Sequence, residues 1–144
     1  MSYEKISRAL DAGVFAADMC EIAKPPVEDD IFRVATALGV TFSEDHVELL
    51  RTWGGSDLHE IRIHAPTQLR LVDGLIEFAD DYSGSAFKYD PDDGAVYADD
   101  DASGETIYLA ASVAEFINDF LLGAKGEDFY GEDWVRELKA RGLA

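Results

Sequence analysis

Residues 75–101 read LIEFADDYSGSAFKYDPDDGAVYADDD, and the architecture of the chain can be worked out from them. Apolar residues recur there at alternate positions, while acidic residues gather around turns that contain glycine. Successive side chains of a strand point to opposite faces of a sheet, so the alternation predicts antiparallel strands with one buried and one solvated face. The solvated face is predicted to be strongly anionic.

The same pattern extends the sheet in both directions. Strands are predicted near residues 61–64, 68–71, 75–79, 86–90, 95–98 and 106–110. Asp73-Gly74 indicates a tight hairpin because both residues tolerate a positive φ, and residues 91–94 and 103–104 indicate further turns. We therefore expect an antiparallel meander of about five to six strands.

Helices are predicted on both sides of this segment. The apolar spacing favours helices over residues 28–39, 44–52, 112–122 and 132–141, and a helical segment over residues 2–23 that Gly13 could divide in two. Ser43 and Ser112 are predicted N-caps, and Ser112 with Glu115 forms a capping-box pattern. The prediction is a single α+β domain, with helices packed on one face of the sheet. Residues 28–122 form its core, with a helical extension at residues 1–27 and a second at residues 123–144.

Length and composition fit a soluble domain of the cytoplasm. A chain of 144 residues can bury a core without a disulfide or a metal, and Cys20, the only cysteine, has no partner for an internal disulfide. Cys20 is predicted to be a packing residue. The start of the chain does not read as a signal peptide, and there is no apolar run of the length that a membrane-spanning helix needs.

Negative charge is concentrated in one half of the chain. The formal net charge is −18, and residues 72–133 hold seventeen acids but only two basic residues, Lys88 and Lys125. Such a field repels nucleic acid and anionic membranes, and it speeds the encounter with cationic protein surfaces. Solubility alone would also explain abundant acids, but their uneven distribution favours a basic protein partner.

Several short motifs, taken in order, resemble those of the SUKH superfamily of Smi/Knr-type domains over about residues 28–122. The motifs are Leu38-Gly39, Phe42-Ser43-Glu-Asp45, Trp53-Gly54-Gly55, Ile76-Glu-Phe78-Ala-Asp80-Asp81, then Gly84, Phe87, Tyr89, Asp90 and Val96, and Leu109-Ala110-Ala-Ser112-Val-Ala-Glu-Phe116-Ile117.

The resemblance implies a protein-binding module without catalytic activity. Most bacterial members of the superfamily look like immunity proteins that neutralise a cognate toxin, frequently a nuclease, and fungal relatives regulate cell-wall synthesis through protein contacts. The expected partner is therefore a basic toxin domain. The alternative is a regulatory module that binds a protein or a small ligand and has no toxin partner.

Catalytic and metal-binding patterns give weaker signals. Asp99-x-Asp101-x-Ser103-Gly104 fits the first half of a calcium loop, but Ala110 stands where the bidentate carboxylate belongs. His59 and His64 would lie on opposite faces of one strand, and no third zinc ligand is evident. No nucleophile elbow, phosphate loop or Cys-His pair is present. We predict no enzymatic activity, no metal and no cofactor.

The predicted partner-binding residues combine an acidic rim with aromatic anchors. Tyrosines among exposed acids are typical of interface anchors, and rim charges mainly steer association. The set is Asp80, Asp81, Tyr82, Asp90, Asp92, Asp93, Tyr97, Asp99, Asp100 and Asp101.

Overall fold

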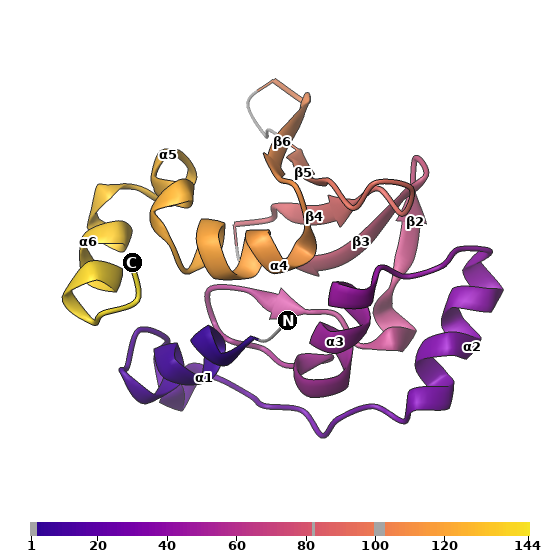
Figure 1. The fold of residues 1–144 in the computed structure, drawn as a ribbon, viewed down its shortest axis with the longest axis horizontal. Coiled ribbons are helices and arrows are strands. Elements are labelled where there is room, and N and C mark those ends of the chain that lie inside the picture. Colours follow the sequence, from indigo (N-terminus) through magenta and orange to yellow (C-terminus); the bar gives the residue numbers. More distant parts are fainter. Residues whose placement is uncertain (1–2, 82, 100–102) are drawn as a thin grey trace.

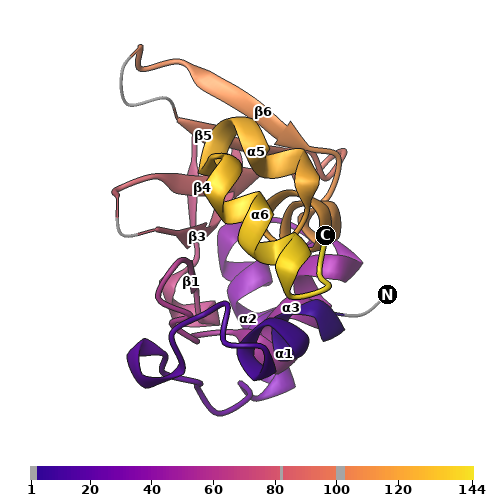
Figure 2. The same ribbon diagram turned by 90° about the vertical axis from the view of Figure 1, so that its left-hand side faces the viewer.

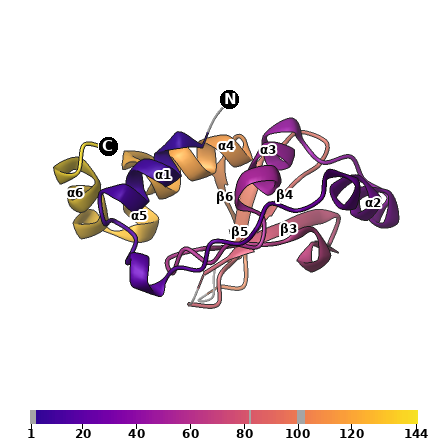
Figure 3. The same ribbon diagram turned by 90° about the horizontal axis from the view of Figure 1, so that it is seen from below.

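A six-stranded antiparallel sheet lies against a layer of helices, as predicted. The computed structural model describes residues 3–81, 83–99 and 103–144 (Figure 1). The strands are β1 (Arg62–Ile63), β2 (Arg70–Val72), β3 (Leu75–Asp80), β4 (Ala86–Tyr89), β5 (Val96–Asp99) and β6 (Thr106–Ala110). The helices are α1 (Glu4–Asp11), α2 (Glu28–Leu38), α3 (Glu44–Trp53), α4 (Val113–Glu115), α5 (Glu127–Tyr130) and α6 (Glu132–Ala140). Figures 2 and 3 show α1, α3 and α4 on one side of the sheet, which confirms the α+β prediction.

Strand β3 is central to the topology. The strand order is β1-β3-β4-β5-β6, and β2 also pairs with β3. β1 pairs with the end of β3 and β2 with its start, both opposite the edge that β4 occupies. Asp73 and Gly74 form the predicted β2–β3 hairpin with φ values of 53° and 80°. β6 is therefore a free edge on one side of the described sheet. On the other side β2 is short, and Ile63 of β1 exchanges backbone hydrogen bonds with Gly55 and Ser56.

Aromatic side chains fill the space between sheet and helices. Phe78, Phe87, Tyr89 and Phe116 are all fully buried. The rings of Phe87 and Phe116 lie 4.8 Å apart, and Phe78 meets Phe116 edge to face at 5.8 Å. These contacts connect β3 and β4 to the helical segment that follows β6.

That helical segment differs from the regular helix predicted over residues 112–122. Ser112 is the N-cap, and its hydroxyl accepts the amide of Glu115 at 3.0 Å, as predicted. The Glu115 carboxylate, however, accepts the amide of Ala111 instead of the Ser112 amide. After α4 the backbone widens into a π-helical turn over Phe116–Leu121, so the predicted capping box is only half formed and the helix is mostly not α-helical.

The prediction for Ser43 is wrong in one respect. Ser43 precedes α3 as the N-cap residue, but its side chain makes no capping bond. The carboxylate of Asp45 accepts the His46 amide at 3.0 Å, so a different side chain satisfies this donor of the first turn.

The two ends of the chain lie against each other and against the core. α1 ends at Asp11, and Gly13 turns the chain with a φ of 75°, which is the division that its position suggested. Arg8 donates to the carbonyl of Gly142 at 3.0 Å, and Arg141 donates to the carbonyl of Ala12. Both helical extensions are therefore part of one packed unit.

Candidate functional site

The face of the sheet that points away from the helices carries a row of polar and aromatic side chains. Pairing between neighbouring strands places Arg70, Glu77, Lys88, Tyr97 and Tyr108 side by side across five strands. We call this side of the sheet the outer face. Charged residues occupy one half of the row and tyrosines occupy the other.

The outer face is neither fully solvated nor simply anionic. The side chains of Glu77 and Lys88 are only 9% and 6% exposed. Arg70 binds one carboxylate oxygen of Glu77 through two nitrogens at 3.2 Å, and Lys88 lies 2.8 Å from Asp99. A buried charge is costly unless it is paired, and these contacts supply the pairing. The prediction of a strongly anionic, wet face is therefore wrong at the centre of the sheet.

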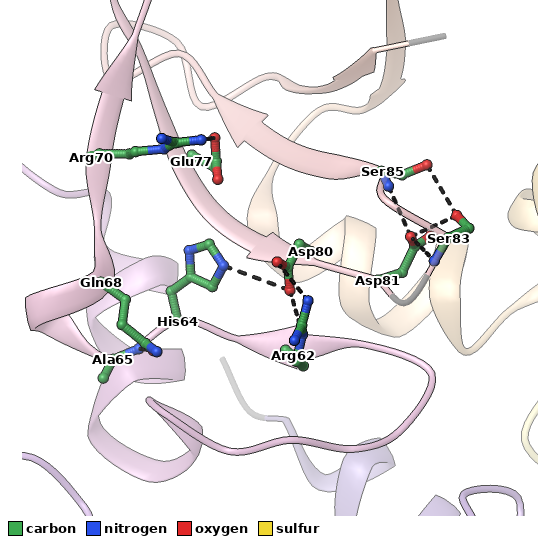
Figure 4. Close-up of polar contacts among 10 residues, drawn as sticks. All are labelled: Arg62, His64, Ala65, Gln68, Arg70, Glu77, Asp80, Asp81, Ser83 and Ser85. Atoms are coloured by element: carbon green, nitrogen blue, oxygen red, sulfur yellow. Dashed lines mark hydrogen bonds and ion pairs between the residues drawn. The ribbon is translucent and has the colours of Figure 1, made fainter. Parts of the chain in front are cut away.

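A second ionic cluster joins β1 to β3 (Figure 4). Arg62 binds both carboxylate oxygens of Asp80, at 2.8 Å and 3.0 Å, in a bidentate arrangement. Nε2 of His64 lies 3.7 Å from the same carboxylate, and the Nδ1 atom of His64 is buried without a hydrogen-bond partner in the described part of the chain. Asp80 is thus held mainly as the ion-pair partner of Arg62.

A polar hollow of about 260 Å³ opens beside this cluster. Its lining residues are Gly55, Ser56, Asp57, Arg62, Ile63, His64, Gln68 and Asp80. Ser56 and Gln68 also serve the local backbone, since the hydroxyl of Ser56 accepts the amide of Ala23 and the side chain of Gln68 accepts the amide of Ala65. The hollow can accommodate a small polar group, but part of its lining is committed to holding loops.

Three of the predicted partner-binding aspartates stabilise turns. One oxygen of Asp81 accepts the amides of Ser83 and Ser85, both at 3.0 Å, and the hydroxyl of Ser83 (Figure 4). Asp90 accepts the amide of Asp92, and Asp93 accepts the amide of Ala95. Aspartate commonly forms such turns, so these positions have a structural role in addition to their charge.

The predicted acidic rim is divided between the two ends of the sheet. In an antiparallel meander, the β3–β4 and β5–β6 turns lie at one end and the β4–β5 turn lies at the other. Asp80, Asp81 and Asp99 therefore share one end, while residues 90–93 occupy the opposite end. Three further members of the predicted set, Tyr82, Asp100 and Asp101, lie outside the described residues.

Tyr97 is half-buried and lies in an aromatic pair that the sequence did not reveal. Its ring meets that of Tyr108 at 5.9 Å, nearly edge to face, and Tyr108 is 57% exposed. Ile107 of the same strand is 39% exposed. The missing information was the β5–β6 register, because only the pairing of Tyr97 with Tyr108 places the rings together.

A buried polar cluster lies on the other side of the sheet, and it too was missed. His46 of α3 is fully buried, its Nδ1 lies 2.7 Å from the hydroxyl of Tyr89, and burial lowers its pKa to about 3. Neighbouring Asp45 accepts the amide of Ala114 at 2.9 Å and so connects α3 to α4. Helical spacing could have indicated that His46 is buried, because His46, Leu50 and Trp53 stand at i, i+4 and i+7 and so share one face of the helix.

The two histidines of the zinc pattern lie in different segments, and the calcium pattern is only partly described. His59 lies in a loop with a φ of 71°, His64 follows β1, and Asp101 of the calcium pattern lies outside the described residues. Among residues 3–81, 83–99 and 103–144, no three histidine, cysteine or acidic side chains gather as metal ligands would.

The geometry alone does not assign a family, and comparison with known proteins adds none. No family model, curated protein or solved structure matches this chain. The SUKH resemblance stays a prediction. Within the described residues, no helix combines the length and the apolar composition needed to cross a bilayer.

Proposed function

We propose that this chain is a non-catalytic, cytoplasmic module that binds a basic protein, and that it acts as an immunity protein against a toxin domain. The observation that carries the proposal is the pair formed by the half-buried Tyr97 and the exposed Tyr108, on a face bordered by uncompensated acids. Aromatic side chains are enriched among the residues that dominate binding energy. The toxin role itself rests on the SUKH resemblance.

The balance of ion pairs supports a cationic partner. The two basic residues of the acidic half are already engaged, Lys88 by Asp99 and Lys125 by Glu115. Within the described residues, no lysine or arginine lies within ion-pair distance of Asp81, Asp92 or Glu105. Their charge is left to act on a partner, and a nuclease toxin would present the cationic surface that normally binds phosphate.

Reversing two exposed charges on the β4–β5 and β5–β6 turns is expected to slow association. The double variant Asp92→Lys with Glu105→Lys should lower the association rate at low salt by about tenfold and weaken its salt dependence, because rim charges act mainly on encounter. The control, Asp128→Lys with Glu132→Lys, makes the same change in net charge at exposed positions on the helical side.

The measurement is stopped-flow binding to a candidate basic toxin domain, with growth rescue when the two are co-expressed. If the control variant slowed association as much as Asp92→Lys with Glu105→Lys does, the association rate would depend on net charge alone and not on the position of the acids. Absence of rescue by the parent chain would remove the immunity role.

Truncating the aromatic anchor is expected to act on dissociation instead. Tyr97→Ala should speed release of the toxin and cost about 1–4 kcal/mol of binding free energy, because a packed aromatic anchor holds the complex after encounter. The control is Phe32→Ala, because the ring of Phe32 on α2 is exposed. Tyr3→Ala is unsuitable as a control because Tyr3 is buried. Equal dissociation rates for the parent and Tyr97→Ala would exclude Tyr97 as an anchor.

A further inference from the structure

Strand β6 has the longest unpaired edge of the described sheet. It spans five residues, whereas β1 and β2 on the opposite edge span two and three. Within the described chain, no backbone group of Thr106–Ala110 hydrogen-bonds outside the β5–β6 ladder. An unpaired edge presents N–H and C=O groups that an incoming strand can bind.

Two of the usual devices that protect an edge strand are absent from β6, and a third, a β-bulge, lies only near its end. Its sequence, TIYLA, contains neither a charged residue nor a proline. The bulge is at Leu109 of β6, because Val96 and Tyr97 pair with Ala110 and Tyr108. Thr106, Ile107 and Tyr108 pair regularly with β5. This leaves a regular template of three residues on the free edge.

The two faces of β6 select different side chains in an added strand. Tyr108 and Thr106 lie on the outer face, where the hydroxyl of Thr106 donates to Asp99. Ile107 lies on the other face and is 39% exposed. The β5–β6 hairpin projects past the helices (Figure 1). A basic side chain in the added strand suits the position beside Tyr108, where it can make a cation–π contact with the ring and lie near Asp99. A branched apolar side chain suits the position beside Ile107.

We propose that β6 is the docking edge for an extended segment of the partner, which adds to the sheet as a strand of alternating basic and apolar residues. This strand addition rests on the proposed function for the charge of the partner, and main-chain hydrogen bonds would provide much of its affinity. A second copy of the chain fits less well, because each copy carries a net charge of −18.

The test uses a capped eight-residue peptide of alternating arginine and valine and the isotopically labelled full chain. NMR titration should shift the amides of residues 105–110 and slow hydrogen exchange at alternate positions of β6. Two further peptides carry N-methyl groups on either the odd or the even amides. Only one of the two N-methylated peptides should lose binding, because only one set of alternate amides in the added strand points toward β6.

Two protein variants provide a matched pair, because Ile107 and Leu71 are 39% and 38% exposed on opposite edges of the sheet. Ile107→Lys should weaken peptide binding by about tenfold, since a charge on an edge strand opposes pairing, and Leu71→Lys, with the same added charge, should have an effect below about twofold. Three outcomes would overturn the proposal. They are equal effects of the two variants on peptide binding, amide chemical-shift changes centred outside residues 105–110, and self-association of the chain that Ile107→Lys abolishes.

The outcomes for docking and for function are separable. If the toxin is neutralised and the Ile107→Lys variant still binds it fully, strand addition at β6 is wrong and the proposed function stands. If the peptide docks on β6 but the parent chain gives no rescue, the proposed function is wrong while the edge remains a strand-binding site.

Discussion

Acidification from pH 7 to pH 5 is expected to lower the free energy of unfolding by about 2 kcal/mol through His46 alone. Burial lowers the pKa of His46 from 6.5 to about 3, an effect that nearby His64 reinforces and Asp45 opposes. The unfolded chain therefore binds a proton that the folded chain excludes throughout this window. The stabilising contribution is complete above pH 6.5 and is lost as the pH falls toward 3, by about 1.4 kcal/mol per pH unit.

Urea unfolding at several pH values between 5 and 7.5 measures this slope. His46→Asn places an amide near the position of Nδ1, beside the Tyr89 hydroxyl, and cannot titrate. We expect it to be less stable than the parent at pH 7 but to have a flatter pH dependence. His59→Asn, at a loop position, should keep the parental slope. A parental slope in His46→Asn would show that His46 is not the group responsible.

Replacing Asp45 with alanine is expected to cost about 2–4 kcal/mol of folding free energy. The Asp45 carboxylate accepts the amides of His46 and Ala114 at 3.0 Å and 2.9 Å, and the residue is buried. Truncation would leave two donors in the interior without acceptors, and each such loss is expensive. It would also remove the connection between α3 and the start of α4.

Two companion variants make the interpretation specific. Asp45→Asn retains one acceptor oxygen and should cost about half as much as Asp45→Ala. Glu44→Ala changes the exposed neighbour and should stay within about 0.5 kcal/mol of the parent. Thermal and urea unfolding at pH 7 compare all four proteins. A loss in Asp45→Ala no larger than in Glu44→Ala would mean that the capping bonds contribute little.

The strands were predictable because their signal is local. Alternation in residues 75–110 and the turn residues between them are properties of neighbouring positions, and the observed strands follow them closely. The burial of Glu77 and Lys88 was not predictable, because their partners Arg70 and Asp99 come from other strands. Pairing of that kind depends on register, which a single sequence specifies weakly.

The candidate site was predictable only in part, and for the same reason. Tyr97 could be chosen for its acidic neighbourhood, but Tyr108 could not be placed beside it without the β5–β6 register. Ser43 was assigned a capping bond that its side chain does not make, because nothing local indicates that the carboxylate of Asp45 binds the nearby amide. Helical periodicity could have indicated His46, although it could not show that the ring lies against Tyr89.

The contacts between the two ends of the chain bear on how the protein opens. Arg8 and Ala12 from the first helical segment each bind the last residues, through Gly142 and Arg141. Lys5 also donates to the carbonyls of Asn118 and Leu122. Fraying of either end would remove partners from the other, so the two should exchange their amide hydrogens as one cooperative unit. The two ends should therefore become accessible to a protease together, in one opening event.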